Sequence, residues 1–281
     1  MIGAGGELGP LLVRAFSAHE VRGTRRAEVD LRDPGSVRRA IGAFDPEAVV
    51  LAAGLADADL CEERPGEAYA VNVDGTRAVA EAARGRHFTF FSTDHVFDGK
   101  SGPYAEEERA DPINVYGRTK LEAERIVRAV HPESLVLRTT LIFHRGPGAR
   151  NFLARLLEAR EPVPCWTDHR ATYTYGPNLA EAAVEMVERR MSGLWHVAGP
   201  DLLDRHAFAL RVAARFGRDP ELFRPVPIRE APPRAPRPLR AGLRSDKARA
   251  ALRTRLLGVD EALERAAADS AKDSAASRNH P

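Results

Sequence analysis

A tyrosine and a lysine four residues apart are the most informative pair in this sequence. They are the ends of Tyr116-Gly117-Arg118-Thr119-Lys120, and on a helix their side chains would share one face. A phenol with a pKa of about 10 exchanges protons poorly at neutral pH, and a nearby ammonium group lowers that pKa. The pair therefore predicts proton exchange with a carbonyl or an alcohol while a hydride moves to or from a nicotinamide.

A threonine upstream of this pair could contact the same reacting group. Residues His87–Phe91 predict a buried strand, and Ser92, Thr93 and Asp94 follow at its carboxyl end. Open α/β sheets bind ligands beyond that end of their strands. Thr93 is therefore a candidate to hydrogen-bond the reacting oxygen, although by itself a threonine that caps the strand would explain the pattern as well.

Three glycines at three-residue spacing open the sequence. Gly3, Gly6 and Gly9 suit a tight turn, close approach of backbone to a pyrophosphate, and packing of the following helix. A glycine-rich turn without a ligand is the alternative. Such a turn normally follows a strand, yet only Met1 and Ile2 precede it. We therefore expect that the true chain starts several residues upstream.

Basic residues follow the next predicted strand. Arg25 and Arg26 could pair with a 2′-phosphate, which favours NADP(H) over NAD(H), and no acidic residue ends that strand. Two solvated surface arginines are the alternative. Asp30 could contact the adenine, with Leu31 packed beside it.

Short apolar runs alternate with amphipathic stretches along most of the chain. This alternation predicts an α/β fold, a doubly wound Rossmann-like parallel sheet with helices on both faces. The predicted strands are Glu20–Thr24, Ala48–Leu51, His87–Phe91, Leu135–Arg138 and Leu194–Val197. The predicted helices are Gly6–Ala18, Pro34–Phe44, Glu67–Ala83, Val115–Ala129, Phe152–Arg160 and Leu179–Arg189.

The less regular second half predicts a small C-terminal substrate lobe. We expect one domain over residues 1–265, with the lobe formed mainly by 141–178 and 199–250. Pro225–Pro238 is rich in proline and arginine, so it cannot be a helix interior, and we expect it to wrap over a surface or a cleft. Residues 266–281 are small and polar, which predicts a frayed tail.

Composition narrows the classes of partner. A net charge of +2, from 42 basic and 40 acidic residues, gives no general attraction to nucleic acid. We find no secretory signal and no apolar run of the roughly 18 residues that a membrane span needs. Cys61 and Cys165 have no partners at metal-ligand spacing, so we expect no metal site. Isolated thiols suit a reducing compartment, so we expect a cytoplasmic protein.

Longer motifs surround the candidate residues. The central motif runs from Ser92 to Gly99, through Pro103-Tyr104, and from Pro112 to Glu124. Further stretches that match are Gly3–Gly9, Ala52–Gly54, Asp59, Cys61-Glu62, Val71–Val73, Arg138–Thr140, Asn151-Phe152, Asp168, Arg237-Pro238 and Asp246-Lys247. Together they resemble the extended short-chain dehydrogenase/reductases, and among these the dTDP-4-dehydrorhamnose reductase and sugar-nucleotide-binding family.

The resemblance implies NADP(H)-dependent reduction of a keto group on a nucleotide-linked sugar. Tyr116 would donate the proton, and Lys120 would adjust Tyr116 and hold the cofactor ribose. Thr93 would contact the reacting oxygen, with Asp94 beside it on the sugar. The cofactor would lie along Gly6, Glu7, Leu8, Asp30, Leu31, Ala53, Gly54 and Leu55. The resemblance also implies a homodimer paired through the helix that carries Tyr116.

Some positions differ from the family pattern. Leu141 stands where an aromatic residue is common, and Tyr173 stands where proline is usual. Related dehydratases carry Thr-Asp-Glu at the strand end, whereas here His95 follows Thr93-Asp94, which argues against dehydration. The motifs also fit a non-catalytic NADP-binding regulatory subunit like that of methionine adenosyltransferase, and a sugar-nucleotide epimerase.

Other arginines, histidines and aromatic residues are less specific. A nucleotide diphosphate could be contacted by Arg234, Arg237, Arg240 and Arg244, or these could be solvated in a proline-rich loop. We interpret His95, His169 and His196 as ordinary polar or core residues rather than a relay. Trp195 and Phe208 are interpreted as core residues.

Overall fold

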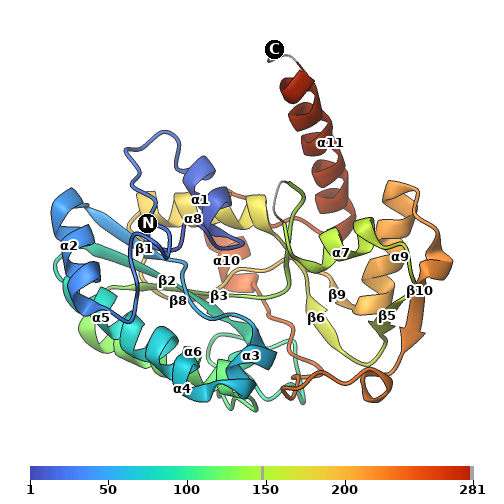
Figure 1. The fold of residues 1–281 in the computed structure, drawn as a ribbon, viewed down its shortest axis with the longest axis horizontal. Helices are drawn as coiled ribbons and strands as arrows, with labels where there is room; N and C mark the ends of the chain where they lie inside the picture. Colours follow the sequence, from blue (N-terminus) through green and yellow to red (C-terminus); the bar gives the residue numbers. More distant parts are fainter. Residues whose placement is uncertain (147–148, 279–281) are drawn as a thin grey trace.

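A four-stranded parallel sheet and the helices packed on it form the larger part of the protein. The computed structural model describes residues 1–146 and 149–278 (Figure 1). The strand order is β1-β2-β3-β8. The strands are Ala48–Leu51 (β1), His87–Thr93 (β2), Leu135–Thr139 (β3) and Gly193–His196 (β8). All three pairings are parallel, which confirms the predicted fold class.

Helices cover both faces of this sheet (Figure 1). Neighbouring side chains along a strand point to opposite faces, so Val49 and Leu51 belong to one core cluster and Val50 to the other. The first cluster is covered by Pro34–Phe44 (α2), Gly75–Ala82 (α5) and Val115–Val130 (α6). The second is covered by Gly9–Ala15 (α1), Gly176–Glu188 (α8) and Asp246–Ala251 (α10). The sheet is therefore doubly wound, as predicted.

Ile2, directly before the glycine turn, pairs with β1 of the sheet. This residue forms parallel bridges to Thr24 and to Leu51, and its N–H donates to the Val50 carbonyl at 2.9 Å. The strand predicted at Glu20–Thr24 is wrong, because in that segment only Thr24 forms a bridge. The rest of the segment has no neighbouring strand to pair with along the described chain.

The helix predicted at Glu67–Ala83 consists of three successive pieces. Pro65–Tyr69 (α4) leads into a π-helical turn at Ala70–Asp74 (η1), and α5 follows. Within this turn, Asn72 accepts a hydrogen bond from the Leu55 N–H at 2.7 Å and donates to the Leu55 carbonyl at 3.0 Å. The π turn therefore fixes the loop that follows β1, at an edge where ligands bind.

A smaller lobe lies beside the sheet, on the right of Figure 1. Its strand pairs are Val163–Trp166 (β5) with Phe223–Val226 (β10), Arg170–Thr172 (β6) with Leu202–Asp204 (β9), and Ile142–Phe143 (β4) with Thr174–Tyr175 (β7). Its helices are Phe152–Glu158 (α7), Arg205–Phe216 (α9) and Val259–Arg278 (α11). Phe208 is fully buried in the lobe core, as predicted. Trp195 packs against the core cluster between the sheet and helices α1, α8 and α10. The residue limits given above for the domain and the lobe stay predictions.

The last helix differs from the expected frayed tail. Helix α11 continues to Arg278, and Figure 1 shows it projecting from the lobe. Its first turns are anchored, since Leu263 and Ala266 are buried in the lobe core. Alanine has the highest helix propensity, so the alanine-rich residues beyond this anchor extend the helix instead of fraying. The helix includes 266–278, the disorder expected of this tail stays a prediction, and 279–281 lie outside the described residues.

Candidate active site

The end of β2 and the start of α6 bring the predicted catalytic residues together. Thr93 is the last residue of β2, and Tyr116 lies in the first turn of α6. The Asn114 side chain begins the helix by accepting a hydrogen bond from the Gly117 N–H at 2.8 Å. A Cβ atom on Gly117 would lie 2.0 Å from the His95 carbonyl oxygen, so only glycine lets α6 pack directly on the segment after β2.

Asp94 is buried between two threonine hydroxyls. Thr140 Oγ1 donates to Asp94 Oδ2 at 2.7 Å, and Thr93 Oγ1 lies 3.2 Å from Oδ1. Burial raises the pKa of Asp94 to about 7, although hydrogen bonds from both threonines oppose this rise. The carboxyl group beside Thr93 can therefore gain or lose a proton near neutral pH.

Tyr116 is shifted in the direction opposite to our expectation. Burial raises the pKa of its phenol, a hydrogen bond with Thr93 opposes the rise, and the charge of Asp94 adds to it. Lys120, which we expected to lower this pKa, is not among the groups that shift it. The phenol is therefore protonated at neutral pH, which is the form that can donate a proton to a carbonyl oxygen.

Lys120 is held against the sheet. Its Nζ donates to the Phe91 carbonyl at 2.7 Å and lies 3.9 Å from the centroid of the Phe90 ring. Burial lowers the pKa of Lys120 to about 7, and the charge of Glu124 opposes this. This contact with the strand explains why the ammonium group does not act on Tyr116, and the lowered pKa lets Lys120 exchange a proton near neutral pH.

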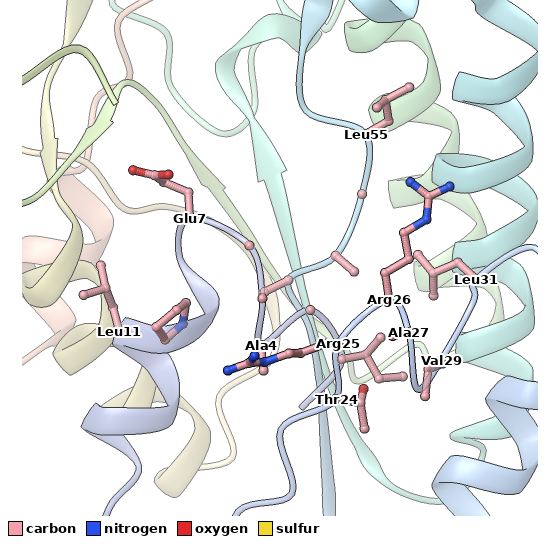
Figure 2. A pocket seen from close by; sticks show the side chains of 18 of the residues that line it. Ala4, Glu7, Leu11, Thr24, Arg25, Arg26, Ala27, Val29, Leu31 and Leu55 are labelled. Atoms are coloured by element: carbon pink, nitrogen blue, oxygen red, sulfur yellow. The ribbon is translucent and has the colours of Figure 1, made fainter. Parts of the chain in front are cut away.

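A cavity of about 950 Å³ lies over the glycine turn (Figure 2). Its size suits a large ligand. The predicted cofactor residues that line it are Gly3, Gly6, Glu7, Arg25, Arg26, Asp30, Leu31, Ala53, Gly54 and Leu55. Gly3 has a φ of +105°, and a Cβ there would lie 2.6 Å from the Ala53 nitrogen. Only glycine therefore fits where the turn packs on the backbone that follows β1, as the predicted tight turn requires.

Other predicted cofactor residues do not line this cavity: Leu8, Gly9, Tyr116 and Lys120. Leu8 is buried in the core cluster between the sheet and helices α1, α8 and α10. Gly9 allows the turn to close, because a Cβ there would lie 2.1 Å from the Gly3 carbonyl oxygen. Tyr116 and Lys120 lie at the neighbouring strand, so the cavity and the catalytic residues occupy adjacent parts of one sheet edge.

The charged groups around the cavity differ in how they are paired. Arg26 is exposed and lies 4.0 Å from Glu67, which is a weak contact, and the exposed Arg25 side chain reaches the cavity in Figure 2. Asp30 is paired, since Arg32 Nη2 lies 2.6 Å from its Oδ2 and holds the pKa of the carboxyl at about 2. The arginines thus remain available to an anion, whereas the adenine contact expected of Asp30 stays a prediction.

Several lobe residues at this cavity were not predicted. His144, Arg145 and Arg150 of the lobe also line it. The Glu7 carboxylate is directed toward the lobe: its Oε1 lies 2.9 Å from His144 Nε2 and 2.7 Å from Asn151 Nδ2. No local pattern identifies these partners, because they come from a different part of the fold.

The proline-rich loop reaches the active site through Arg237. Its Nη2 lies 3.0 Å from Asp59 Oδ1 and the side chain is mostly buried, whereas Arg234 is exposed and pairs with Glu63. Asn114 connects this loop to the site, since its Nδ2 donates to the Pro236 carbonyl at 2.8 Å and lies 2.9 Å from His95 Nδ1. Of the two open interpretations, Arg237 fits a site residue and Arg234 fits a solvated one.

Three histidines interpreted as ordinary residues do not share one environment. His196 is buried against the Phe97 ring and lies 3.1 Å from the Tyr104 carbonyl oxygen. The rings of His95 and Tyr116 are 5.4 Å apart. Burial lowers the pKa of His95 to about 4, so its ring is neutral.

Within residues 1–146 and 149–278, no three His, Cys, Asp or Glu side chains are grouped as metal ligands. The described helices include none with the length and apolar character that crossing a membrane requires.

Comparison with known proteins supports the resemblance noted from the motifs. The sequence model of the RmlD substrate binding domain matches residues 1–272. A dTDP-4-dehydrorhamnose reductase of Mycobacterium tuberculosis is 33% identical over 248 residues, covering 84% of this chain and 81% of that protein. A probable low-salt glycan biosynthesis reductase of Haloferax volcanii is 32% identical over 262 residues, covering 86% of this chain and 87% of the relative.

Solved structures have the same architecture. A hypothetical dTDP-4-dehydrorhamnose reductase from Sulfolobus tokodaii superposes with a TM-score of 0.83 at 30% identity, covering 92% of this chain and 97% of that one. A dTDP-4-dehydrorhamnose reductase from Bacillus anthracis in complex with NADP has a TM-score of 0.90 at 23% identity, covering 95% and 97%. This second likeness shows the shared fold, and the predicted family resemblance is confirmed.

Proposed function

Since this chain belongs to the RmlD substrate-binding-domain family, we propose that it is an NADP(H)-dependent oxidoreductase that reduces a keto group on a nucleotide-linked sugar. The favoured substrate is dTDP-4-dehydrorhamnose, by similarity to the relatives that carry that name. The observation that carries the proposal is the protonated Tyr116 phenol beside Thr93 at the sheet edge next to the cavity. A protonated phenol suits the direction of reduction.

The catalytic roles follow from the contacts around Tyr116. When bound, NADPH supplies the hydride to the carbonyl carbon and leaves as NADP⁺. Tyr116 Oη donates its proton to the carbonyl oxygen, so the C=O group becomes an alcohol. Thr93 hydrogen-bonds the same oxygen and orients the phenol. Water replaces the proton that Tyr116 gives up in each turnover, and Lys120, one turn further along α6, holds the cofactor ribose.

The cofactor is held along the cavity over the glycine turn. The backbone of Gly3 and Gly6, at the start of α1, faces the pyrophosphate. Arg25 and Arg26 pair with the 2′-phosphate of NADP(H), which explains a preference over NAD(H). Asp94, hydrogen-bonded by Thr140, orients Thr93 and contacts a sugar hydroxyl.

Two finer points accompany this proposal. By analogy with relatives, we propose a homodimer paired through α6, and a cytoplasmic location. The exposed face of α6 carries Arg118, Glu122, Arg125 and Arg128, so such an interface would be polar and its affinity would fall as salt rises. Light scattering at low and high salt measures the assembly state, and a monomer at both would contradict the dimer.

The experiment that tests the function is NADPH oxidation in the presence of dTDP-4-dehydrorhamnose, followed by absorbance. We expect turnover by the wild type and a loss of about 100-fold or more in Tyr116→Phe, because general acid catalysis contributes about that much. Tyr69→Phe is the matched control, since Tyr69 is exposed on α4 and lies outside the cavity lining. Full activity in Tyr116→Phe would contradict the assigned role.

The same assay separates the alternative functions. An epimerase would interconvert sugar-nucleotide isomers without net consumption of NADPH. A regulatory subunit would bind NADPH tightly, show no oxidation on any sugar nucleotide, and co-purify with a stoichiometric partner enzyme. Either result would replace the reductase proposal.

A further inference from the structure

Arg205 is a cation in an unfavourable position. It is the first residue of α9, where the helix dipole presents a positive end. The carboxylate of Asp204 next to it is engaged in capping this helix, accepting a hydrogen bond from the Ala207 N–H at 2.7 Å. The helix end therefore gives the Arg205 charge no compensation.

Two aromatic rings and two arginines lie close to Arg205, and Tyr173 is the neighbour that most favours its charge. Its guanidinium carbon lies 4.4 Å from the Trp166 ring centroid and 4.9 Å from that of Phe152. Its Nε is buried and has no hydrogen-bond partner, and no ion pair joins it to the described residues. Burial lowers the pKa of Arg205, and the charges of Arg237 and Arg155 lower it further. Arg205 is half-buried, and a buried N–H without a partner costs free energy, so an anion that accepts from this guanidinium would remove that cost.

Arg205 also lies near two histidines, one of which is close to Tyr116. Its charge lowers the pKa of both His169 and His95, and the His95 ring is 5.4 Å from the Tyr116 ring. The His169 ring in turn lies 5.6 Å from the Trp166 ring. The guanidinium is therefore close to the histidines that lie between the lobe and Tyr116.

We infer that Arg205 binds a phosphate of the substrate's nucleotide diphosphate, an inference that rests on the function proposed above. A planar guanidinium donates two parallel hydrogen bonds to phosphate oxygens. Arg237 is already paired with Asp59 and the neighbouring histidines are neutral, whereas Arg205, with Arg155 near it, has no acidic partner among the described residues. The cofactor phosphates have their own arginines at the glycine turn.

The test measures dTDP binding to the NADP⁺-loaded protein by calorimetry. We expect Arg205→Gln to weaken dTDP binding about 10- to 100-fold, as for loss of a hydrogen-bonded charge pair, and to leave NADP⁺ affinity unchanged. Arg215→Gln is the matched control, because it removes the same charge from an exposed position on the same helix. Thymidine, which lacks the diphosphate, should bind the wild type and Arg205→Gln equally.

A second variant separates binding from folding. Arg205→Met keeps an unbranched stem against Phe152 and Trp166, and loss of a buried unpaired charge should leave the unfolding midpoint equal or higher. We expect this variant to lose dTDP affinity as well. Wild-type dTDP affinity in either folded variant would overturn the inference while leaving the proposed function intact. Failure of the wild type itself to bind dTDP or to oxidise NADPH would overturn the proposed function together with the inference.

Discussion

Glu7 of the glycine turn and His144 of the lobe lie 2.9 Å apart across the mouth of the cofactor cavity. Asn151 and the Arg150 N–H also donate to the Glu7 carboxylate. These contacts join the turn that faces the pyrophosphate to the lobe that faces the substrate. The Glu7 carboxylate is therefore one of the groups that connect the lobe to the glycine turn.

We predict that in Glu7→Gln the free energy of unfolding depends less on pH at acid pH than it does in the wild type. Burial raises the pKa of Glu7, but His144, Asn151 and the Arg150 N–H together lower it below its usual value, so its stabilising effect is complete above about pH 4.5 and is lost as the pH falls below this. The variant should be about 1 kcal/mol less stable than the wild type at neutral pH and equal at low pH. Urea unfolding across this pH range measures the difference. A constant difference at all pH values would contradict the assignment.

Asp94 should have the opposite effect on stability. Its pKa is raised to about 7, so folding favours the protonated form, and the charge destabilises the fold as the pH rises from about 4 to 7. Asp94→Asn should therefore gain stability relative to the wild type at pH 8, by up to about 4 kcal/mol, and little at pH 4.

This gain should come with a loss of turnover, because the carboxylate no longer orients Thr93. Denaturant unfolding and NADPH oxidation on the same samples test both effects. A variant that is less stable than the wild type at pH 8 would show that Asp94 is structural.

Arg25 and Arg26 should set the choice of cofactor. We predict that Arg25→Ala and Arg26→Ala each weaken NADPH binding about 10-fold, because each removes a charge-assisted contact to the 2′-phosphate, and leave NADH binding nearly unchanged. Arg22→Ala is the matched control, since Arg22 is exposed outside this cavity lining. Equal losses for the two cofactors would mean that the arginines contact the pyrophosphate instead.

Local patterns predicted which residues lie together at the sheet edge better than they predicted the environments of these residues, whose catalytic roles stay a prediction. Tyr116 and Lys120 lie one turn apart on a single helix, and Thr93 ends a strand, so spacing alone located them. The raised pKa of Tyr116 was not predictable, because it depends on burial beneath distant segments. Arg205 was missed for the same reason: nothing in its local sequence shows that tertiary packing would bury its Nε without a hydrogen-bond partner.

The errors in secondary structure have similar causes. Glu20–Thr24 has the composition of a strand, but a strand forms only where a neighbour pairs along its length, and here only Thr24 forms a bridge. Residues 266–278 lack an apolar pattern of their own, but they continue a helix anchored by Leu263 and Ala266. In the first segment the lack of a pairing neighbour outweighs local composition. In the second segment the anchored helix outweighs it.

Gly117 should be the glycine on which catalytic geometry depends most. A Cβ there would meet the His95 carbonyl oxygen at 2.0 Å, so Gly117→Ala must push α6 away from the end of β2. We predict a loss of about 1–3 kcal/mol in stability and of about 100-fold in kcat, because Tyr116 moves relative to Thr93. Gly42→Ala is the matched control: it lies in α2 with no atom within 4 Å of its Cβ, and should raise stability by about 0.5–1 kcal/mol with no change in kcat. If Gly117→Ala loses stability but keeps full kcat, the close packing of α6 on His95 serves folding and does not position the proton donor.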